Sequence, residues 1–164
     1  MKAYINVNLV TCDSEFHVYQ EGLLVVEDDR IAYCGPYDQA WLEKCSETVD
    51  YEGAWIMPGL VNCHTHSAMT LLRGIRDDSN LHEWLEDYIW PAESQFTAEV
   101  TTKAVQFALA EMLLSGTTTF NDMYNPHGVD IKQVYQAVRQ SGMRCYFSPT
   151  LFTSPAETAE ETLI

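Results

Sequence analysis

The sequence predicts an α/β protein in which a small β unit precedes a parallel sheet flanked by helices. Short β-prone runs fill residues 1–56, whereas residues 57–164 alternate strand, helix, strand, helix and strand. This alternation is typical of a parallel sheet, because the chain must cross back through a helix before the next strand begins. Met57-Pro58-Gly59 separates the two patterns. We therefore expect two parts, residues 1–56 and residues 57–164.

A hairpin is the clearest feature of the first part. Residues 23–26 and 31–33 are apolar runs, and the polar residues 27–30 between them are suited to a tight turn. A short helix over residues 37–45 and a strand over residues 48–51 follow. We expect these elements to form part of a β-sandwich.

The second part opens with a strand over residues 60–64, whose apolar character predicts burial. A long irregular stretch then runs to about residue 96. Thr97 is suited to cap a helix, and Gly116 is suited to end it. The expected buried face of this helix repeats at helical spacing through Val100, Ala104, Phe107, Ala108 and Met112.

Two further strands and a second helix complete the alternation. Residues 117–123 form a β-branched strand, and residues 143–147 form the next one. Asp130 is suited to cap the helix between them, and Gly142 is suited to end it. The expected buried face of this helix consists of Ile131, Val134, Tyr135 and Val138.

The last residues predict one more helix. Ser154, Pro155 and Glu157 form a capping box with proline at the first helical position. The sequence ends at Ile164, before such a helix could bury a useful face. We therefore expect a chain that stops within a domain.

Composition excludes several classes of partner. Lys and Arg total 9 against 24 Asp and Glu, a net charge of -15 that repels nucleic acid and anionic membranes. We find no apolar run long enough to span a bilayer and no signal peptide, so we expect a cytoplasmic protein. The five cysteines are odd in number and lack a CxxC pair, which argues against a disulfide framework and a cysteine zinc site.

The strongest chemical signal is His64-Thr65-His66, directly after the apolar strand. Side chains at i and i+2 project to the same side of a strand, so two imidazoles can converge on one ion. Imidazole suits zinc or iron(II). Two histidines at this spacing also occur by chance, but a strand that enters through Pro58-Gly59 strengthens the prediction of a metal site.

These residues belong to a longer pattern. It comprises MPGLVNCHTH (57–66), MTLLRG (69–74), WPAE (90–93) and EMLLSGTTT (111–119). The pattern resembles the amidohydrolase superfamily, in particular the branch of 5'-methylthioadenosine/S-adenosylhomocysteine deaminases and Atz/Trz-type hydrolases. The resemblance covers nearly the whole chain and is far more specific than the histidine pair alone.

The resemblance implies a (β/α)8 TIM barrel beside a composite β-sandwich. Such a barrel needs roughly 250 residues, so residues 57–164 supply about three of its eight units and the barrel is truncated. One metal is implied, usually zinc with iron as the alternative, and His64 and His66 are its implied ligands. A later His and Asp would complete the ligand set, and a later Glu and His would move protons, so no catalytic residue is expected within this chain.

The implied reaction is hydrolytic deamination, in which the metal activates water for attack on an amidine carbon and ammonia leaves. The implied substrate is a purine nucleoside, specifically an adenosine-type thioether nucleoside. Glu93 matches the position that holds the ribose hydroxyls, and Trp84 is a second candidate for substrate contact. Without the resemblance, Glu93 would be interpreted as a solvated loop acid, and Trp84 as a packing residue.

Other interpretations stay open. Ser148-Pro149-Thr150-Leu151 lacks the arginine that follows the third strand in several methylthioadenosine deaminases. An Atz/Trz-type chlorohydrolase or a guanine-deaminase-like aminohydrolase is therefore the alternative enzyme. An inert truncation or interaction fragment is the non-enzymatic alternative. We expect the 164 residues alone to be inactive, because two ligands fall short of the three protein ligands typical of catalytic zinc. Formation of a homo-oligomer is left open.

Three further polar residues need an interpretation. Glu111 falls on the expected apolar face of its helix, so we expect a structural carboxylate with a hydrogen-bonding partner. Asp122 follows the second strand of the sheet, where capping or loop bonding is favoured over a role in the site. His127 is expected in a surface turn.

Overall fold

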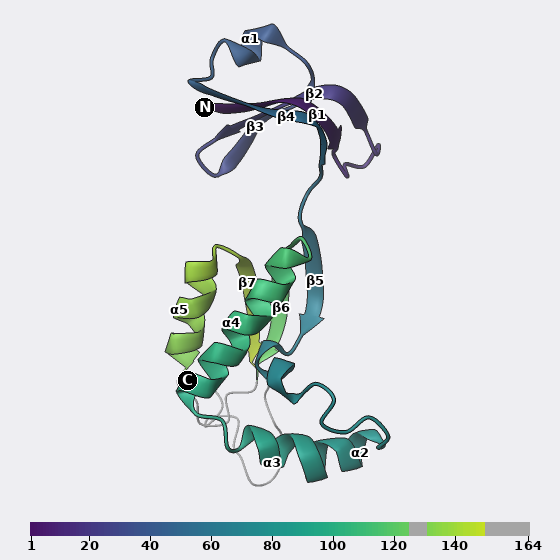
Figure 1. Cartoon of the computed structure of the whole chain (residues 1–164), viewed down its shortest axis with the longest axis vertical. Helices are drawn as coiled ribbons and strands as arrows, with labels where there is room; N and C mark the ends of the chain where they lie inside the picture. Colours follow the sequence, from purple (N-terminus) through teal and green to yellow (C-terminus); the bar gives the residue numbers. More distant parts are fainter. Residues whose placement is uncertain (125–130, 150–164) are drawn as a thin grey trace. The chain divides into compact units, whose positions relative to one another are not determined.

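The structure, a computed structural model, describes residues 1–124 and 131–149 (Figure 1). The chain divides into two compact units, Met1–Pro58 and Gly59–Ile164. The predicted cap Asp130, the predicted turn histidine His127 and the predicted capping box at residues 154–157 lie outside the described residues. No helix in the described part of the chain is long and apolar enough to cross a membrane.

A four-stranded sheet forms the first unit, in the order β3-β2-β1-β4. β1 (Lys2–Val10) pairs antiparallel with β2 (Val18–Glu27), and β2 pairs antiparallel with β3 (Arg30–Pro36). This pairing confirms the predicted hairpin, which turns at Asp28 with a left-handed φ of 51°. β4 (Glu47–Ile56) then runs parallel to β1 and is longer than predicted.

The core of the first unit lies between this sheet and the short helix α1 (Gln39–Leu42). Asp38 caps α1, because its side chain accepts a 2.8 Å hydrogen bond from the backbone N–H of Ala40. Leu23 and Val25 are buried on the α1 side, so the alternating residues Leu24 and Val26 face the opposite side. There they line an apolar hollow of about 500 Å³.

The second unit is a three-stranded parallel sheet with two helices on one face (Figure 1). β5 (Leu60–Thr65), β6 (Thr117–Tyr124) and β7 (Arg144–Pro149) lie in chain order. The alternation of strands and helices predicted this sheet, and the structure confirms it. The core joins the sheet to α4 (Ala98–Leu114) and α5 (Ile131–Ser141), and its buried residues are Val105, Leu109, Phe120, Val134, Val138 and Met143.

Three of the predicted helix ends, at Thr97, Gly116 and Gly142, are confirmed. The Thr97 hydroxyl accepts a 3.2 Å hydrogen bond from the backbone N–H of Val100 and so caps α4. Gly116 and Gly142 follow the two helices with φ of 83° and 75°. This left-handed conformation closes a helix without the steric penalty that a side chain would bring.

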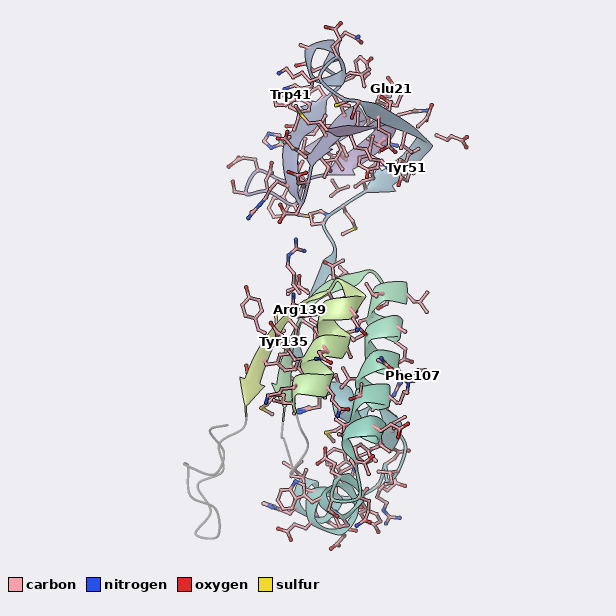
Figure 2. The ribbon with its side chains drawn as sticks, turned by 90° about the vertical axis from the view of Figure 1, so that its left-hand side faces the viewer. Glu21, Trp41, Tyr51, Phe107, Tyr135 and Arg139 are labelled. Carbon is pink, nitrogen blue, oxygen red and sulfur yellow. The ribbon has the colours of Figure 1, made fainter. Side chains whose placement is uncertain are left out.

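The predicted buried face of α4 was partly wrong. Phe107 is 50% exposed and Val100 is 37% exposed, whereas Val105 and Leu109 are fully or almost fully buried. Apolar residues occupy several sides of this helix, so spacing alone does not single out the side that packs on the sheet. Tyr135 on α5 is likewise 51% exposed, against prediction. Figure 2 shows Phe107 on α4, and Tyr135 together with Arg139 on α5.

The expected irregular stretch before residue 96 is largely helical. η1 (Ser67–Leu72) is a 3-10 helix, and a later helical run comprises α2 (Leu81–Glu83), η2 (Trp84–Ile89, a π-helical segment) and α3 (Trp90–Glu93). Asn80 starts this run, because its side chain accepts a 3.1 Å hydrogen bond from the backbone N–H of Glu83. The sequence signal was this cap followed by an acidic residue at the third helical position.

Burial of the strand at residues 60–64 was also predicted wrongly. The strand forms as β5, but Leu60 is 52% exposed and Val61 is 62% exposed. Within the described residues β5 pairs only with β6. Its apolar side chains therefore lie at an edge of the sheet.

Candidate metal centre

The parallel sheet brings the carboxyl ends of its three strands to one edge. Thr65 of β5 is opposite Asp122 of β6, and Met123 of β6 is opposite Ser148 of β7. His64 lies in β5 one residue before its end, and His66 directly follows the strand. The two histidines therefore lie at the edge where α/β barrels carry their active sites.

The two imidazole rings are close and nearly perpendicular. Their centroids are 5.0 Å apart and the planes are inclined by 84°. Zinc binds imidazole nitrogen at about 2.0–2.1 Å in tetrahedral geometry, which holds the centres of two ligating rings about 5 Å apart. The separation in this structure therefore fits a pair of ligands to one ion.

The hydrogen bond of His66 determines which ring nitrogen is available. Nδ1 of His66 lies 3.1 Å from the backbone carbonyl oxygen of Met123. A carbonyl oxygen only accepts, so Nδ1 carries the proton and donates it. In the neutral ring Nε2 then keeps its lone pair, which is the arrangement of a metal ligand oriented by its other nitrogen. His64 is exposed, and its backbone N–H donates to Oδ1 of Asn62 at 3.1 Å.

Asp122 is fully buried beside this pair and bonds to the residue that follows His66. Its Oδ1 accepts a 3.0 Å hydrogen bond from the backbone N–H of Ser67, and its Oδ2 accepts a bond from the Ser67 hydroxyl. The predicted loop bonding of Asp122 is confirmed. Burial raises the pKa of the Asp122 carboxyl, and the bonds from Ser67 oppose that rise.

A cavity of about 260 Å³ opens beside His66. Its lining, drawn from the described residues, consists of His66, Met69, Thr70, Leu72, Arg73 and Trp84. Trp84, a candidate for substrate contact, thus lies in the same hollow as a candidate metal ligand. Glu93 does not belong to this lining; it is half-buried at the end of α3.

An ion pair connects Arg73, which lines this cavity, to α4. Nη2 of Arg73 lies 2.6 Å from Oε2 of Glu111, and the guanidinium lies over the ring of Phe107 at 5.7 Å. The predicted structural partner of Glu111 is therefore Arg73, but Glu111 is 44% exposed rather than buried. The sequence motif contained Arg73, and Ser67 directly follows its first segment, yet nothing local identified their partners 38 and 55 residues away.

The described residues bring two imidazole rings close together at this edge. Nowhere in residues 1–124 and 131–149 do three His, Cys, Asp or Glu side chains gather as a metal site would require. Catalytic zinc sites use three protein ligands and keep one open position. The two histidines by themselves therefore fall short of the ligand set of a catalytic zinc site.

Comparison with known proteins identifies the family that this chain resembles in sequence. The sequence model of the Amidohydrolase family matches residues 55–163. A 5-methylthioadenosine/S-adenosylhomocysteine deaminase from Bacillus cytotoxicus is 44% identical over 162 residues, which cover 99% of this chain and 37% of that protein. The chain thus spans a little over a third of the length of the curated relatives it matches.

Solved structures give the same fold. The zinc complex of atrazine chlorohydrolase TrzN from Arthrobacter aurescens TC1 has a TM-score of 0.79 at 21% identity, covering 98% of this chain and 37% of that one. An adenosine deaminase from Xanthomonas campestris with bound zinc has a TM-score of 0.73 at 32% identity, covering 88% and 32%. These similarities confirm the predicted fold, part of an amidohydrolase TIM barrel preceded by a β unit.

Proposed function

The chain belongs to the amidohydrolase family, and we propose that it supplies the first metal ligands and part of the substrate pocket of a hydrolytic deaminase. The proposed substrate is a purine nucleoside of the 5'-methylthioadenosine or S-adenosylhomocysteine type. The observation that carries this proposal is the pair of imidazoles 5.0 Å apart at the carboxyl edge of the sheet. The 44% identity to a deaminase with that substrate name supports the choice of substrate.

In this proposal His64 and His66 hold one divalent metal, with zinc favoured because two solved neighbours contain it. When bound, such a metal lowers the pKa of water and polarises the atom under attack. The Met123 carbonyl keeps the His66 ring in the tautomer that leaves Nε2 free for the metal. The ring therefore needs no rearrangement before it binds.

The substrate side of the proposal rests on Trp84 and Glu93. Trp84 lines the 260 Å³ cavity beside His66 and offers an apolar face to a flat purine or a thioether. Glu93 would accept hydrogen bonds from the two ribose hydroxyls, for which a carboxylate is well suited. Groups that move protons are not assigned to this chain, so we expect it to be inactive by itself.

The net charge of the chain indicates which partners it can bind. With a net charge of -15 the chain repels phosphate backbones and anionic lipid, so we propose a small-molecule partner. Separately from the charge, we propose a location in the cytoplasm. Self-association is not required by the proposal. A second candidate function is hydrolysis of a chlorinated or amino heterocycle, which the absence of an arginine in Ser148-Pro149-Thr150-Leu151 favours.

Metal content tests the proposal first. We expect the purified chain to retain zinc, measured by mass spectrometry after dialysis, and the double variant His64→Ala/His66→Ala to lose it. His17→Ala is the matched control, because His17 belongs to the first unit and pairs with Asp13. Equal zinc in the double variant and the wild type would contradict the metal site.

Substrate class and activity need separate measurements. We expect zinc-loaded chain to give ligand-observed NMR signals with 5'-methylthioadenosine, and Glu93→Gln to weaken them more than Glu99→Gln on the first turn of α4. Binding of atrazine in preference to the nucleoside would favour the second candidate. Ammonia release by the 164-residue chain alone would contradict the expected inactivity.

A further inference from the structure

We propose that Asp122 is a positioning residue for His66, acting through Ser67. The inference rests on the proposed metal site and adds to it a residue that binds no metal. In this arrangement the Asp122 carboxylate holds the backbone where the chain leaves β5, so that the His66 ring approaches the metal from a fixed direction.

Asp122 and Ser67 form a buried contact. Asp122 is 0% exposed and Ser67 is 1% exposed, and both oxygens of the carboxylate are used. One oxygen accepts from the Ser67 backbone N–H at 3.0 Å and the other from the Ser67 hydroxyl. Two bonds to one residue fix both its backbone and its side-chain rotamer, and bonds to a charged acceptor are the stronger kind.

Ser67 lies at the junction between β5 and η1. His66 has φ -124° and ψ 76°, which is neither strand nor helix, and Ser67 begins η1 directly after it. This junction has no capping bond from the His66 side chain. The Ser67 carbonyl accepts a 2.9 Å bond from the Thr70 hydroxyl, which ties the first turn together. A carboxylate that holds Ser67 therefore holds the hinge on which the His66 ring is mounted.

Two neighbouring residues of β6, Asp122 and Met123, hold the chain on the two sides of this hinge. The Asp122 side chain binds the backbone of Ser67, and the Met123 carbonyl binds the ring of His66 at 3.1 Å. Displacement of Ser67 would also displace the ring from the Met123 carbonyl. The position of Nε2 thus depends on Asp122 through Ser67, in addition to the electrostatic interaction between Asp122 and His66.

Asp122 acts on the proposed metal ligand through Ser67 and is not itself a ligand. Asp122 and Phe120 are two residues apart on β6, and both are fully buried, so they share the face that packs under the helices. Both Asp122 oxygens are already bonded to Ser67. A buried carboxylate is unfavourable unless hydrogen-bonded, and here it is satisfied by the residue that follows the candidate ligand.

The test compares Asp122→Asn with Phe120→Leu in the 164-residue chain. Asn keeps the shape but loses the charge and one acceptor, whereas Phe120→Leu disturbs the same strand and face without touching Ser67. We expect Asp122→Asn to weaken zinc binding about 10- to 100-fold, the usual effect of removing a group that orients a ligand. Phe120→Leu should lower stability but leave the zinc dissociation constant within about twofold of the wild type, a margin below that range.

A second measurement needs no metal. In metal-free chain labelled with 15N-histidine at about pH 8, above the ordinary histidine pKa, we expect His66 to show the tautomer protonated at Nδ1. Asp122→Asn should give a mixture of tautomers, and Phe120→Leu should not. Ser67→Ala, which keeps the carboxylate and removes one donor, should change both measurements in the same direction and replaces Asp122→Asn if that variant does not fold.

The outcomes are distinct. A folded Asp122→Asn chain with unchanged zinc affinity and an unchanged His66 tautomer would overturn the positioning role. An equal loss in Phe120→Leu would also overturn it, since general loosening would then explain the effect. If the wild type binds no zinc, the proposed metal site fails, and the tautomer measurement alone decides the role of Asp122.

Discussion

The two units bury different kinds of side chain. In the first unit the buried side chains are all apolar: Ala3, Val7, Leu9, Leu23 and Val25. In the second unit, as far as the structure describes it, four polar side chains are also buried: Ser67, Thr101, Thr117 and Asp122. Buried polar groups cost free energy unless they are hydrogen-bonded. Two of the four, Ser67 and Asp122, bond to each other beside the histidine pair.

Both units contain long-range strand pairing, but only in the second unit does such a pairing adjoin the histidine pair. In the first unit β1 pairs with β4 across 45 residues, beside the local hairpin of β2 and β3, and in the second unit β5 pairs with β6 across more than fifty residues. Long-range pairing can bring chemistry from separate segments to one edge, as with His66 and Met123. The first unit thus illustrates a scaffold and the second a scaffold that also positions functional groups.

The largest expected effect comes from opening the core of each unit in turn. Phe120→Ala should destabilise the second unit by about 3–5 kcal/mol, and Leu23→Ala should destabilise the first by about 2–5 kcal/mol. Each unit has its own buried cluster, so each variant should speed hydrogen exchange mainly in its own unit, as measured by mass spectrometry of peptides. Equal acceleration in both units would show that the chain unfolds as a single cooperative block.

The same contrast explains what could be predicted from sequence. The hairpin, the Thr97 cap and the Gly116 ending depend on neighbours within a few residues, and all three are present. The buried face of α4 depends on which side meets the sheet, and Phe107 proved half exposed while Val105 is buried. Local spacing does not contain that information.

The candidate site divides in the same way. The spacing of His64 and His66 predicted two imidazoles on one side, and their rings lie 5.0 Å apart. The roles of His64, His66, Glu93 and Trp84 stay predictions. The Ser67 bond to Asp122 spans 55 residues and could not be found from either local segment. The contacts that orient a ligand were therefore the part that sequence reasoning missed.

Helix caps sharpen the comparison with a smaller effect. Thr97→Ala should destabilise the second unit by about 1 kcal/mol, because the first turn of α4 loses a bonded N–H. Asp38→Ala removes the matching bond from the four-residue helix α1. We expect its effect on the free energy of unfolding to be smaller, since α4 carries more of its unit's core. Chemical denaturation checks both, with Thr97→Ser as the conservative control.

The smallest effect concerns pH, where the two units should respond with opposite sign. Asp13 accepts hydrogen bonds from the backbone N–H and ring of His17, and these lower the pKa of its carboxyl to about 2. Its contribution to the stability of the first unit is therefore present above the ordinary Asp pKa of 3.8 and is lost as pH falls through about 2.

Asp122 should behave in the reverse way, because burial raises the pKa of its carboxyl. The stability that this group contributes is present below 3.8 and is lost as pH rises through its raised value. Carboxyl 13C shifts recorded between about pH 6 and pH 2, a range around the ordinary Asp pKa, would follow both groups. Asp13→Asn should remove the acid-induced loss from the loop of the first unit without altering the Asp122 titration. If the Asp13 and Asp122 carboxyls titrated with the same midpoint, their different surroundings would not affect their pKa values. The expected contrast between the two units would then be wrong.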